Sequence, residues 1–418
     1  MGKTLTEKIL SNKSGVDAKA GDIVIVPADL VFTHDISGPL TITQFKESGL
    51  GKLANPKSTP IFLDHCAPSP RLELANDQKV LRTFAQEFGC PLYQVGDGIC
   101  HQLVVEDWAN PGDIVLGGDS HTCTIGGLGA FATGMGSTDI AVAMALGKTW
   151  LRVPETFLVK ITGKFPRGVY SKDLILHLIG LLGAEGATYK ALEFGGDTIR
   201  TMTMSQRFTV ANMAVEAGAK VGLFPADEIN RAYLETHGRG DRFQSLLPDP
   251  DAIYEKVVEI DARKLGPMVA QPHSVDNVVP VSKVAGTKVD QVFIGSCTNA
   301  RLEDLAVAAS ILNGKKGHPQ TRLIIVPASR TVYREALDKG YIKIFINAGA
   351  AVLNPGCAAC AGIHQGILAK DKMCLSTTNR NFKGRMGNPE SFVYLASPAT
   401  AAASAITGEI TSPEKCLS

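Results

Sequence analysis

The sequence has no run of about twenty uninterrupted apolar residues, the length that an α-helix needs to cross a bilayer. Its first residues, Met1 to Lys8, contain charges but no apolar segment, so we expect no secretory signal. The formal net charge is only +1, and neither half of the chain carries a long run of one sign. Nucleic acids and anionic membranes both require a basic face, so we expect neither as the main partner.

Aromatic residues are scarce at 6%, whereas glycine is abundant, with 42 in a chain of 418 residues. The composition, 44% hydrophobic and 20% charged, is typical of a globular protein with many close turns. The nine cysteines are an odd number in a chain without an export signal, which favours reduced thiols or metal ligands over disulfides. The expected compartment is therefore the cytoplasm.

Short apolar segments alternate with helical patterns along most of the chain, which predicts an α/β protein with mainly parallel sheets. The length indicates two or three domains. Changes of pattern suggest three, at residues 1–154, 155–282 and 283–418. In such sheets the chemistry collects at the carboxyl ends of the strands, so the motifs that follow strands are the candidates for a site.

Three cysteines stand in similar settings, each in a turn of small residues after an expected strand. Cys297 follows the strand expected at 289–294, and Cys357 and Cys360 follow the strand expected at 350–353. Three thiolates presented in this way indicate an iron–sulfur or zinc site with one open coordination position.

A Cys-x-x-Cys pair alone is ambiguous, because zinc ribbons, thioredoxin-like redox sites and iron–sulfur clusters all use it. A structural zinc needs a fourth ligand, normally from a second close pair, and the sequence has none. A redox pair would lie at a helix start without a third cysteine. We therefore favour a cluster whose three thiolate ligands leave one iron free. The other cysteines are expected to be small buried residues: Cys66, Cys90, Cys100, Cys123, Cys374 and Cys416.

Histidines and aspartates also gather after expected strands. Asp64-His65 follows the strand expected at 60–63, and Asp119-Ser120-His121 follows the strand expected at 113–116. A neighbouring carboxylate fixes the tautomer of an imidazole and raises its basicity, as a general acid requires. One histidine in a long chain is usually structural, but together with His101 these residues indicate acid–base catalysis.

A basic loop follows the apolar segment 373–375. It contains Asn379, Arg380, Asn381, Lys383 and Arg385, which could clamp a carboxylate through bidentate hydrogen bonds. Alone, such a loop is more simply a solvated basic surface. Its place some twenty residues after the cysteine pair favours a position in the same cleft.

These motifs together resemble the aconitase superfamily, and the resemblance extends over essentially the whole chain. The segments that carry it are Gly295-Ser296-Cys297-Thr298-Asn299, Asn354-Pro355-Gly356-Cys357 with Cys360, Gly118-Asp119-Ser120-His121-Thr122 and Asn379-Arg380-Asn381-Phe382. Within the superfamily the chain is most similar to the short large subunits of isopropylmalate-type dehydratases and homoaconitases. The resemblance implies three α/β domains with mainly parallel sheets around a central [4Fe–4S] cluster, which has three cysteine ligands and one open iron.

The resemblance also implies a role for each matching residue. The cluster ligands would be Cys297, Cys357 and Cys360, and the residues that contact the cluster would be Asn212 and Asn299. The catalytic residues would be Asp64, His65, His101, Asp119, His121 and Glu216. The substrate-binding residues would be His34, Ser120, Asn379, Arg380 and Arg385. In this scheme Asp64-His65 protonates a departing hydroxyl, Asp119 pairs with His101, and Asn212 and Glu216 share one helix face. His34 stands where aconitases proper have glutamine, which favours an isopropylmalate-like enzyme over a citrate one.

Single-chain aconitases carry the catalytic serine on a further, swivelling domain that this sequence does not contain. We therefore expect a separate small subunit to supply both. The expected reaction is a dehydration and rehydration of a small hydroxy-diacid through a cis-alkene, interconverting 2-isopropylmalate and 3-isopropylmalate in leucine biosynthesis. Alternatives are a homoaconitase, a dimethylmalate- or methylmalate-type dehydratase, an RNA-binding iron sensor or an electron carrier. The basic loop argues against an electron carrier, and the near-neutral charge argues against RNA binding.

Overall fold

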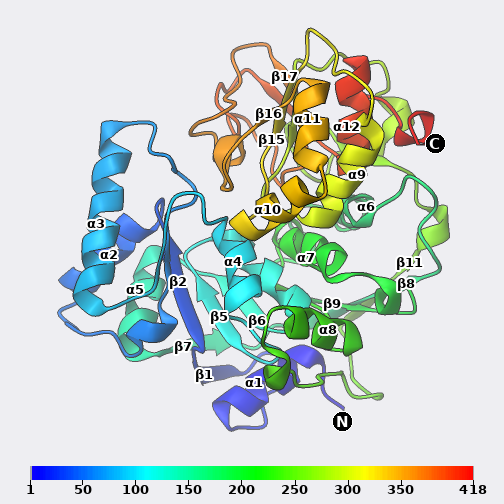
Figure 1. The fold of residues 1–418 in the computed structure, drawn as a ribbon. Helices are drawn as coiled ribbons and strands as arrows, with labels where there is room; N and C mark the ends of the chain where they lie inside the picture. Colours follow the sequence, from blue (N-terminus) through cyan, green and yellow to red (C-terminus); the bar gives the residue numbers. More distant parts are fainter. Residues whose placement is uncertain (1, 418) are drawn as a thin grey trace.

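The structure is a computed structural model that describes residues 2–417. Within this range the strands form four sheets, of which the three larger ones come from successive stretches of the chain (Figure 1). The parallel pairs within these three sheets confirm the predicted α/β fold. The division into three domains stays a prediction.

The first large sheet has five parallel strands in the order β4-β3-β2-β5-β6. Its strands are β2 (Leu30–His34), β3 (Ile61–Phe62), β4 (Leu92–Tyr93), β5 (Ile114–Gly117) and β6 (Phe131–Gly134). The helices of this part are α1 (Leu5–Ser14), α2 (Gly38–Glu47), α3 (Leu72–Phe88), α4 (Cys100–Asp107) and α5 (Ser137–Leu146). The sequence did not reveal β2, which lies at the centre of this sheet and ends at His34.

The second large sheet has four parallel strands in the order β10-β9-β8-β11. They are β8 (Thr156–Thr162), β9 (Ala191–Gly195), β10 (Val221–Leu223) and β11 (Lys256–Asp261). The helices of this part are α6 (Ser171–Leu182), α7 (Met204–Asn212) and α8 (Glu228–Thr236).

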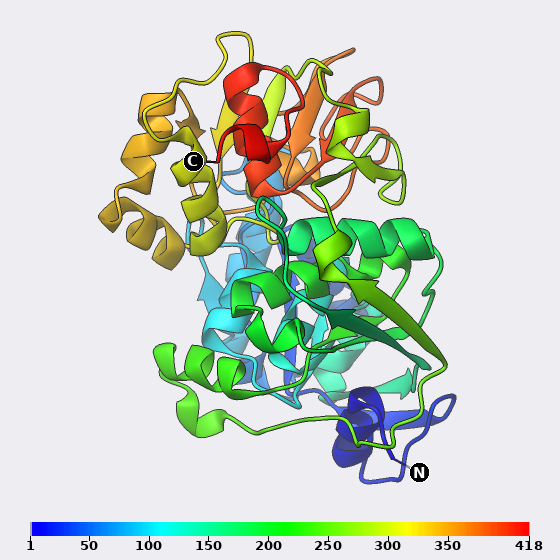
Figure 2. The ribbon, with the colours of Figure 1, turned by 90° about the vertical axis from the view of Figure 1, so that its right-hand side faces the viewer.

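The third large sheet has seven strands in the order β13-β12-β18-β17-β14-β15-β16. Its strands are β12 (Met268–Ala270), β13 (Val278–Pro280), β14 (Gln291–Ile294), β15 (Arg322–Ile325), β16 (Ala351–Val352), β17 (Met373–Ser376) and β18 (Phe392–Leu395). Its helices are α9 (Leu302–Leu312), α10 (Arg330–Asp338), α11 (Tyr341–Ala348) and α12 (Pro398–Thr407). This part lies above the other two in Figure 2.

Shared hydrophobic cores join the three parts. One core contains Phe157 and Phe194 of the second sheet together with Phe293 and Leu395 of the third. Another contains Ile61 of the first sheet together with Leu223 of the second. Burial of apolar surface stabilises a fold by roughly 25 cal/mol per Å². These shared cores therefore keep the sheets, and the loops at their ends, in fixed positions relative to one another.

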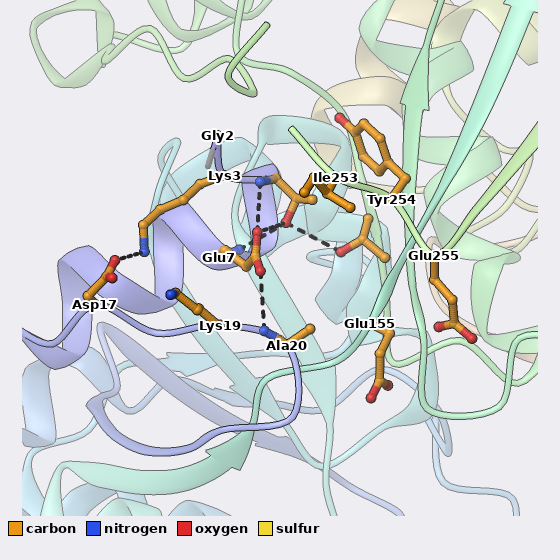
Figure 3. A pocket seen from close by; sticks show the side chains of 12 residues that line it. Gly2, Lys3, Glu7, Asp17, Lys19, Ala20, Glu155, Ile253, Tyr254 and Glu255 are labelled. Atoms are coloured by element: carbon orange, nitrogen blue, oxygen red, sulfur yellow. Dashed lines mark hydrogen bonds and ion pairs between the residues drawn. The ribbon is translucent and has the colours of Figure 1, made fainter. Parts of the chain in front are cut away.

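The N-terminal segment is anchored by its own capping interactions. Thr4 caps α1, because its side chain accepts a hydrogen bond from the backbone of Glu7 while the Glu7 side chain accepts one from the backbone of Thr4. Lys3 pairs with Asp17 (Figure 3), and 2.5 Å separates Lys3 Nζ from Asp17 Oδ1. The ribbon of β1 (Ile23–Pro27) and β7 (Lys148–Arg152) pairs antiparallel next to this segment.

None of the helices in residues 2–417 combines the length and the apolar character that crossing a membrane requires.

Arg207 of α7 offers a test of the core. Its side chain is fully buried and donates hydrogen bonds to both carboxylate oxygens of Asp227, at 2.9 and 2.7 Å. We expect R207Q to lower the free energy of unfolding by about 3 kcal/mol, because it removes a fully buried guanidinium and leaves the acceptors on Asp227, Asn230 and Ile199 without their donor. The control R263Q breaks the exposed pair of Arg263 with Asp261 and should lower the free energy of unfolding far less, because solvent screens that pair. Equal losses in urea unfolding of the two variants would contradict this role of Arg207.

Candidate active site

A cavity of about 270 Å³ lies where loops of the first and third sheets meet. It is lined by the ends of β2 and β5, the start of α4 and the loops that follow β14, β16 and β17. Twelve of the predicted site residues line it: His34, His65, His101, Asp119, Ser120, His121, Cys297, Cys357, Cys360, Asn379, Arg380 and Arg385. Segments separated by more than three hundred positions therefore meet at one site.

The turn that carries Cys357 docks directly on the loop that carries Asp64. The backbone N–H of Cys357 donates to the Asp64 carbonyl at 2.9 Å. The preceding Gly356 has φ +155°, and a Cβ there would lie 2.9 Å from the same carbonyl. A larger residue would separate the two loops, which explains the glycine before Cys357.

All three cysteines are buried, with 5%, 3% and 2% of Cys297, Cys357 and Cys360 exposed. Side-chain N–H groups point at two of the sulfurs. Asn212 Nδ2 lies 3.1 Å from Cys297 Sγ, and Asn379 Nδ2 lies 3.5 Å from the same sulfur. Arg385 Nη2 lies 3.6 Å from Cys360 Sγ. Such donors stabilise sulfur that carries negative charge.

The cysteines differ in how readily they ionise. Burial raises the pKa of the Cys297 thiol to about 11. At Cys360 the hydrogen bond with Cys357 and the guanidinium of Arg385 lower the pKa of the thiol against the effect of burial. All nine cysteines of the chain are free thiols, so none of the three is lost to a disulfide.

Asp119 is the centre of a group of four histidines. It caps the 3₁₀ helix η2 (Ser120–Leu128), where its Oδ1 accepts from the backbone N–H of His121 at 2.7 Å. The same oxygen lies 2.9 Å from His101 Nε2, and Oδ2 lies 3.6 Å from both His34 Nε2 and His65 Nε2. Burial would raise the pKa of Asp119, but His101 and the other partners hold it well below its usual range.

Asp64 and His65 form a buried ion pair, with 2.9 Å between Asp64 Oδ1 and His65 Nδ1. Asp64 Oδ2 accepts the backbone N–H of Cys100 at 2.7 Å. Burial disfavours both charges, yet each partner stabilises the other, so the pKa of Asp64 is lowered to about 2 and that of His65 is raised to about 9. At neutral pH His65 is therefore an imidazolium with Nε2 toward the cavity side, near Asp119.

Glu216 links His121 to Arg380. Its Oε1 lies 2.7 Å from His121 Nε2 and 2.8 Å from Arg380 Nε. The sequence suggested one helix face for Asn212 and Glu216, and this is wrong. Helix α7 ends at Asn212, and Glu216 lies on the 3₁₀ turn η4 (Ala214–Ala217). Both side chains still reach the neighbourhood of the site, because both contact residues of η2. Asn212 donates to Thr124, and Glu216 contacts His121.

The basic loop after β17 provides cationic groups at the cavity. Arg380 keeps 26% of its side chain exposed, and Arg385 Nε is buried without a hydrogen-bond partner among residues 2–417. A buried N–H without a partner is costly, which indicates a site for an anionic ligand.

Asn299, expected at the cluster, is turned the other way. Its Nδ2 donates to Asp304 at 2.8 Å and to Thr209 at 3.2 Å. Its amide thus supports the loop of Cys297 from behind, whereas Asn212 and Asn379 point at the sulfur.

A second group of potential metal ligands, His34, Asp35, Asp64 and His65, has atoms within 4.8 Å of one another. Its carboxylates are already satisfied. Asp35 accepts the backbone N–H groups of His65 and Cys66 at 2.9 and 3.0 Å, and also the Gln78 amide at 3.0 Å. This group is a hydrogen-bonded support for the Asp64-His65 loop, and its residue Asp35 was not among the predicted site residues. Recognising β2 would have placed Asp35 at a strand end.

The donor set fits an iron–sulfur cluster. Three buried sulfurs border one cavity, and their hydrogen-bond donors are amides and a guanidinium, which would stabilise thiolates and a charged cluster. Cys297, Cys357 and Cys360 would hold it. A structural zinc would need a fourth ligand, and His65, His101 and His121 at the cavity are already bonded to carboxylates.

Comparisons with known proteins agree with one another. The aconitase family (aconitate hydratase) matches residues 7–408. A 3-isopropylmalate dehydratase large subunit of Elusimicrobium minutum is 58% identical over 417 residues, covering 100% of both chains. The 3-isopropylmalate dehydratase large subunit 1 of Thermotoga maritima is 54% identical over 419 residues, again covering 100% of both. The crystal structure of Thermococcus kodakaraensis aconitase X in its holo form has a TM-score of 0.50 at 14% identity over 90% of each chain, which shows similarity of fold alone.

Proposed function

The chain belongs to the aconitase family, and from this premise we propose that it is the large, catalytic subunit of a hydro-lyase that interconverts 2-isopropylmalate and 3-isopropylmalate, a step of leucine biosynthesis. The observation that carries the proposal is the meeting of three buried cysteines, the Asp64–His65 pair and two arginines at one cavity. Each of these groups has a task in removing water from a hydroxy-diacid.

The proposed cofactor is a [4Fe–4S] cluster held by Cys297, Cys357 and Cys360 with one open iron. When bound, it would supply a Lewis acid for the hydroxyl and one carboxylate of the substrate. Asn212, Asn379 and Arg385 donate toward the sulfur ligands and would fix their orientation.

The chain's own residues would perform the proton transfer to the leaving hydroxyl. His65 is protonated at neutral pH because Asp64 holds its Nδ1–H at 2.9 Å, so Nε2–H is the available acid. His121 is oriented by the Asp119 and Glu216 carboxylates, and His101 by Asp119. Burial lowers the pKa of His101, which keeps this ring neutral as a hydrogen-bonding partner of Asp119.

Substrate carboxylates would be bound by Arg380 and Arg385. The Nε of Arg380 is held by Glu216 at 2.8 Å, which fixes the plane of the guanidinium, and Arg385 offers its unpartnered Nε. Ser120 and His34 line the same cavity and would contact the substrate. His65, His101 and His121 are committed to the carboxylates of Asp64, Asp119 and Glu216. We therefore assign abstraction of the α-proton to a serine of the swivelling small subunit.

The partner is therefore part of the proposal. The curated relatives described above are named large subunits, which supports a small subunit for this chain too. The compartment we propose is the cytoplasm, because none of the nine cysteines pairs in a disulfide, as a reducing environment favours.

The function is tested by purifying the chain without oxygen and assaying it alone and together with an isopropylmalate dehydratase small subunit. We expect negligible turnover alone. With the partner we expect a kcat/KM for 3-isopropylmalate that exceeds those for homocitrate, citrate and dimethylmalate by roughly 100-fold or more. A preference for homocitrate would make the enzyme a homoaconitase, and full activity of the isolated chain would place the base within it.

Both the stability of the folded chain and its activity should depend on pH, because the pKa of His65 is raised. A group whose pKa rises from its ordinary value near 6.5 to about 9 on folding stabilises the folded state fully below pH 6.5 and loses this effect as pH rises through 9. Activity that needs the imidazolium should therefore decline above about pH 9. In a profile of kcat/KM from pH 6 to 10, D64N should move this alkaline limb to lower pH. If D64N leaves the alkaline limb unchanged, the limb reports the titration of a group other than His65.

A further inference from the structure

Lys172 is a fully buried cation that the catalytic scheme does not use. It lies in the first turn of α6 with 0% of its surface exposed. Its Nζ donates to the carbonyl oxygens of Thr377 and Thr378 at 2.7 and 2.6 Å, and Asn299 Oδ1 lies at 3.5 Å. Burying an ammonium costs several kcal/mol, so its position calls for a compensating negative charge.

The partners of Nζ identify its protonation state. All three are oxygen acceptors, and a neutral amine has only two N–H groups, so this arrangement fits the ammonium, which has three. None of the three carries a formal charge. The nearest carboxylate in this network, Asp304, is reached through Asn299, whose Nδ2 donates to Asp304 Oδ1 at 2.8 Å.

The two loops that Lys172 joins are those that surround Cys297. Thr377 and Thr378 immediately precede Asn379, and Asn299 follows Cys297 by two positions. Asn379 closes the connection, because its Nδ2 lies 3.5 Å from Cys297 Sγ and 3.1 Å from Thr298 Oγ1. A shift of the ammonium would therefore move both loops relative to the sulfur.

We propose that Lys172 is a positioning residue that fixes the loops of Cys297 and Asn379. Its positive charge would also offset the negative charge of a cluster held by the three cysteines. This inference rests on the proposed function, since it assigns a residue to the environment of the proposed cluster. Asp304 and Asp173 stabilise the ammonium, and thiolates bound to the cluster would add negative charge on the side of Cys360 and Cys297.

The charge of Lys172 and the negative charge at the cysteines stabilise each other. Burial lowers the pKa of Lys172 to about 7, while Asp304, Cys360, Asp173 and Cys297 oppose this effect. By the same interaction the ammonium favours added negative charge at the cluster. Reduction potentials of iron–sulfur clusters depend on nearby charge and hydrogen bonds, so a neutral residue at this position should disfavour reduction.

The test compares the reduction potentials of clusters in K172Q, K172R and R207Q with that of the wild-type chain, by dithionite titration followed by electron paramagnetic resonance. K172Q keeps an N–H donor but removes the charge, whereas K172R keeps the charge. We expect K172Q to lower the equilibrium constant for reduction about tenfold, which is about 59 mV for one electron, and K172R to stay close to wild type. R207Q removes a different buried cation and should leave the potential unchanged.

Each outcome of this experiment either supports or overturns a stated role of Lys172. An unchanged potential in K172Q, or an equal decrease in K172R, overturns the charge role. Should K172Q assemble no cluster while K172R does, the charge is required for assembly and the proposal holds. If neither variant assembles a cluster while R207Q does, the shape of the lysine is required for positioning, and the charge role is overturned. A wild-type chain without iron and sulfide would instead overturn the proposed function itself.

Discussion

Replacing Cys297 by alanine should remove the cluster and lower isopropylmalate isomerisation at least about 1,000-fold. The Lewis acid is worth several kcal/mol of transition-state stabilisation, and each 1.36 kcal/mol corresponds to a factor of ten in rate. Cys297 receives N–H groups from Asn212 and Asn379 at 3.1 and 3.5 Å, so its sulfur is the most strongly supported of the three. The measurements are iron content, visible absorption and turnover with the small subunit present.

The control for this substitution is C90A. Cys90 is also buried, with 8% of its surface exposed, but it lies at the end of α3 outside the cavity. C90A should keep iron and activity even if it loses some stability. C357A and C360A should behave as C297A. Retention of iron and full activity by C297A would remove this residue from the ligand set.

Replacing His65 by glutamine should lower kcat by 100-fold to 10,000-fold while the cluster stays in place. This range is typical of losing a general acid, and His65 is the imidazolium that Asp64 keeps protonated. Glutamine preserves a polar side chain of similar reach, so the neighbouring Cys357 turn, which docks on the Asp64 carbonyl, should keep its geometry. Turnover and visible absorption, measured on the same preparation, separate the two effects.

The matched control is H237Q, at the end of α8 and outside the cavity. It should leave both turnover and absorption unchanged. If H65Q keeps near wild-type kcat, another group protonates the leaving hydroxyl. If H65Q loses the cluster together with its activity, His65 supports the cysteine loops and its role as an acid is not established.

Much of the site could be predicted because its residues follow strands. Cys297, Asp119 and the Cys357 turn each come after an apolar segment, and parallel strands deliver their ends to one edge. The α/β class followed from the same alternation. Strand β2 was missed because the apolar segment is short and the chain turns sharply before it, and Asp35 was missed with it.

Other features depend on contacts that no local pattern contains. Lys172 reaches Thr377 across 205 positions, and the first turn of an apolar helix gives no sign of this contact. Asn299 stands in a site motif, yet its amide turns toward Asp304 because Arg301 and Asp304 begin α9 there. The spacing of Asn212 and Glu216 suggested a continuous helix, and only the observed end of α7 shows otherwise. Sequence spacing indicates neighbourhood, whereas the direction of a side chain is decided by packing.

The most direct test of the central claim is the content of iron, sulfide and zinc in the chain purified without oxygen. Three thiolates around one open iron predict iron and sulfide in equal amounts, about four of each per chain, with little zinc. Zinc as the main metal, or the absence of both iron and sulfide, would contradict the assignment of Cys297, Cys357 and Cys360 as cluster ligands.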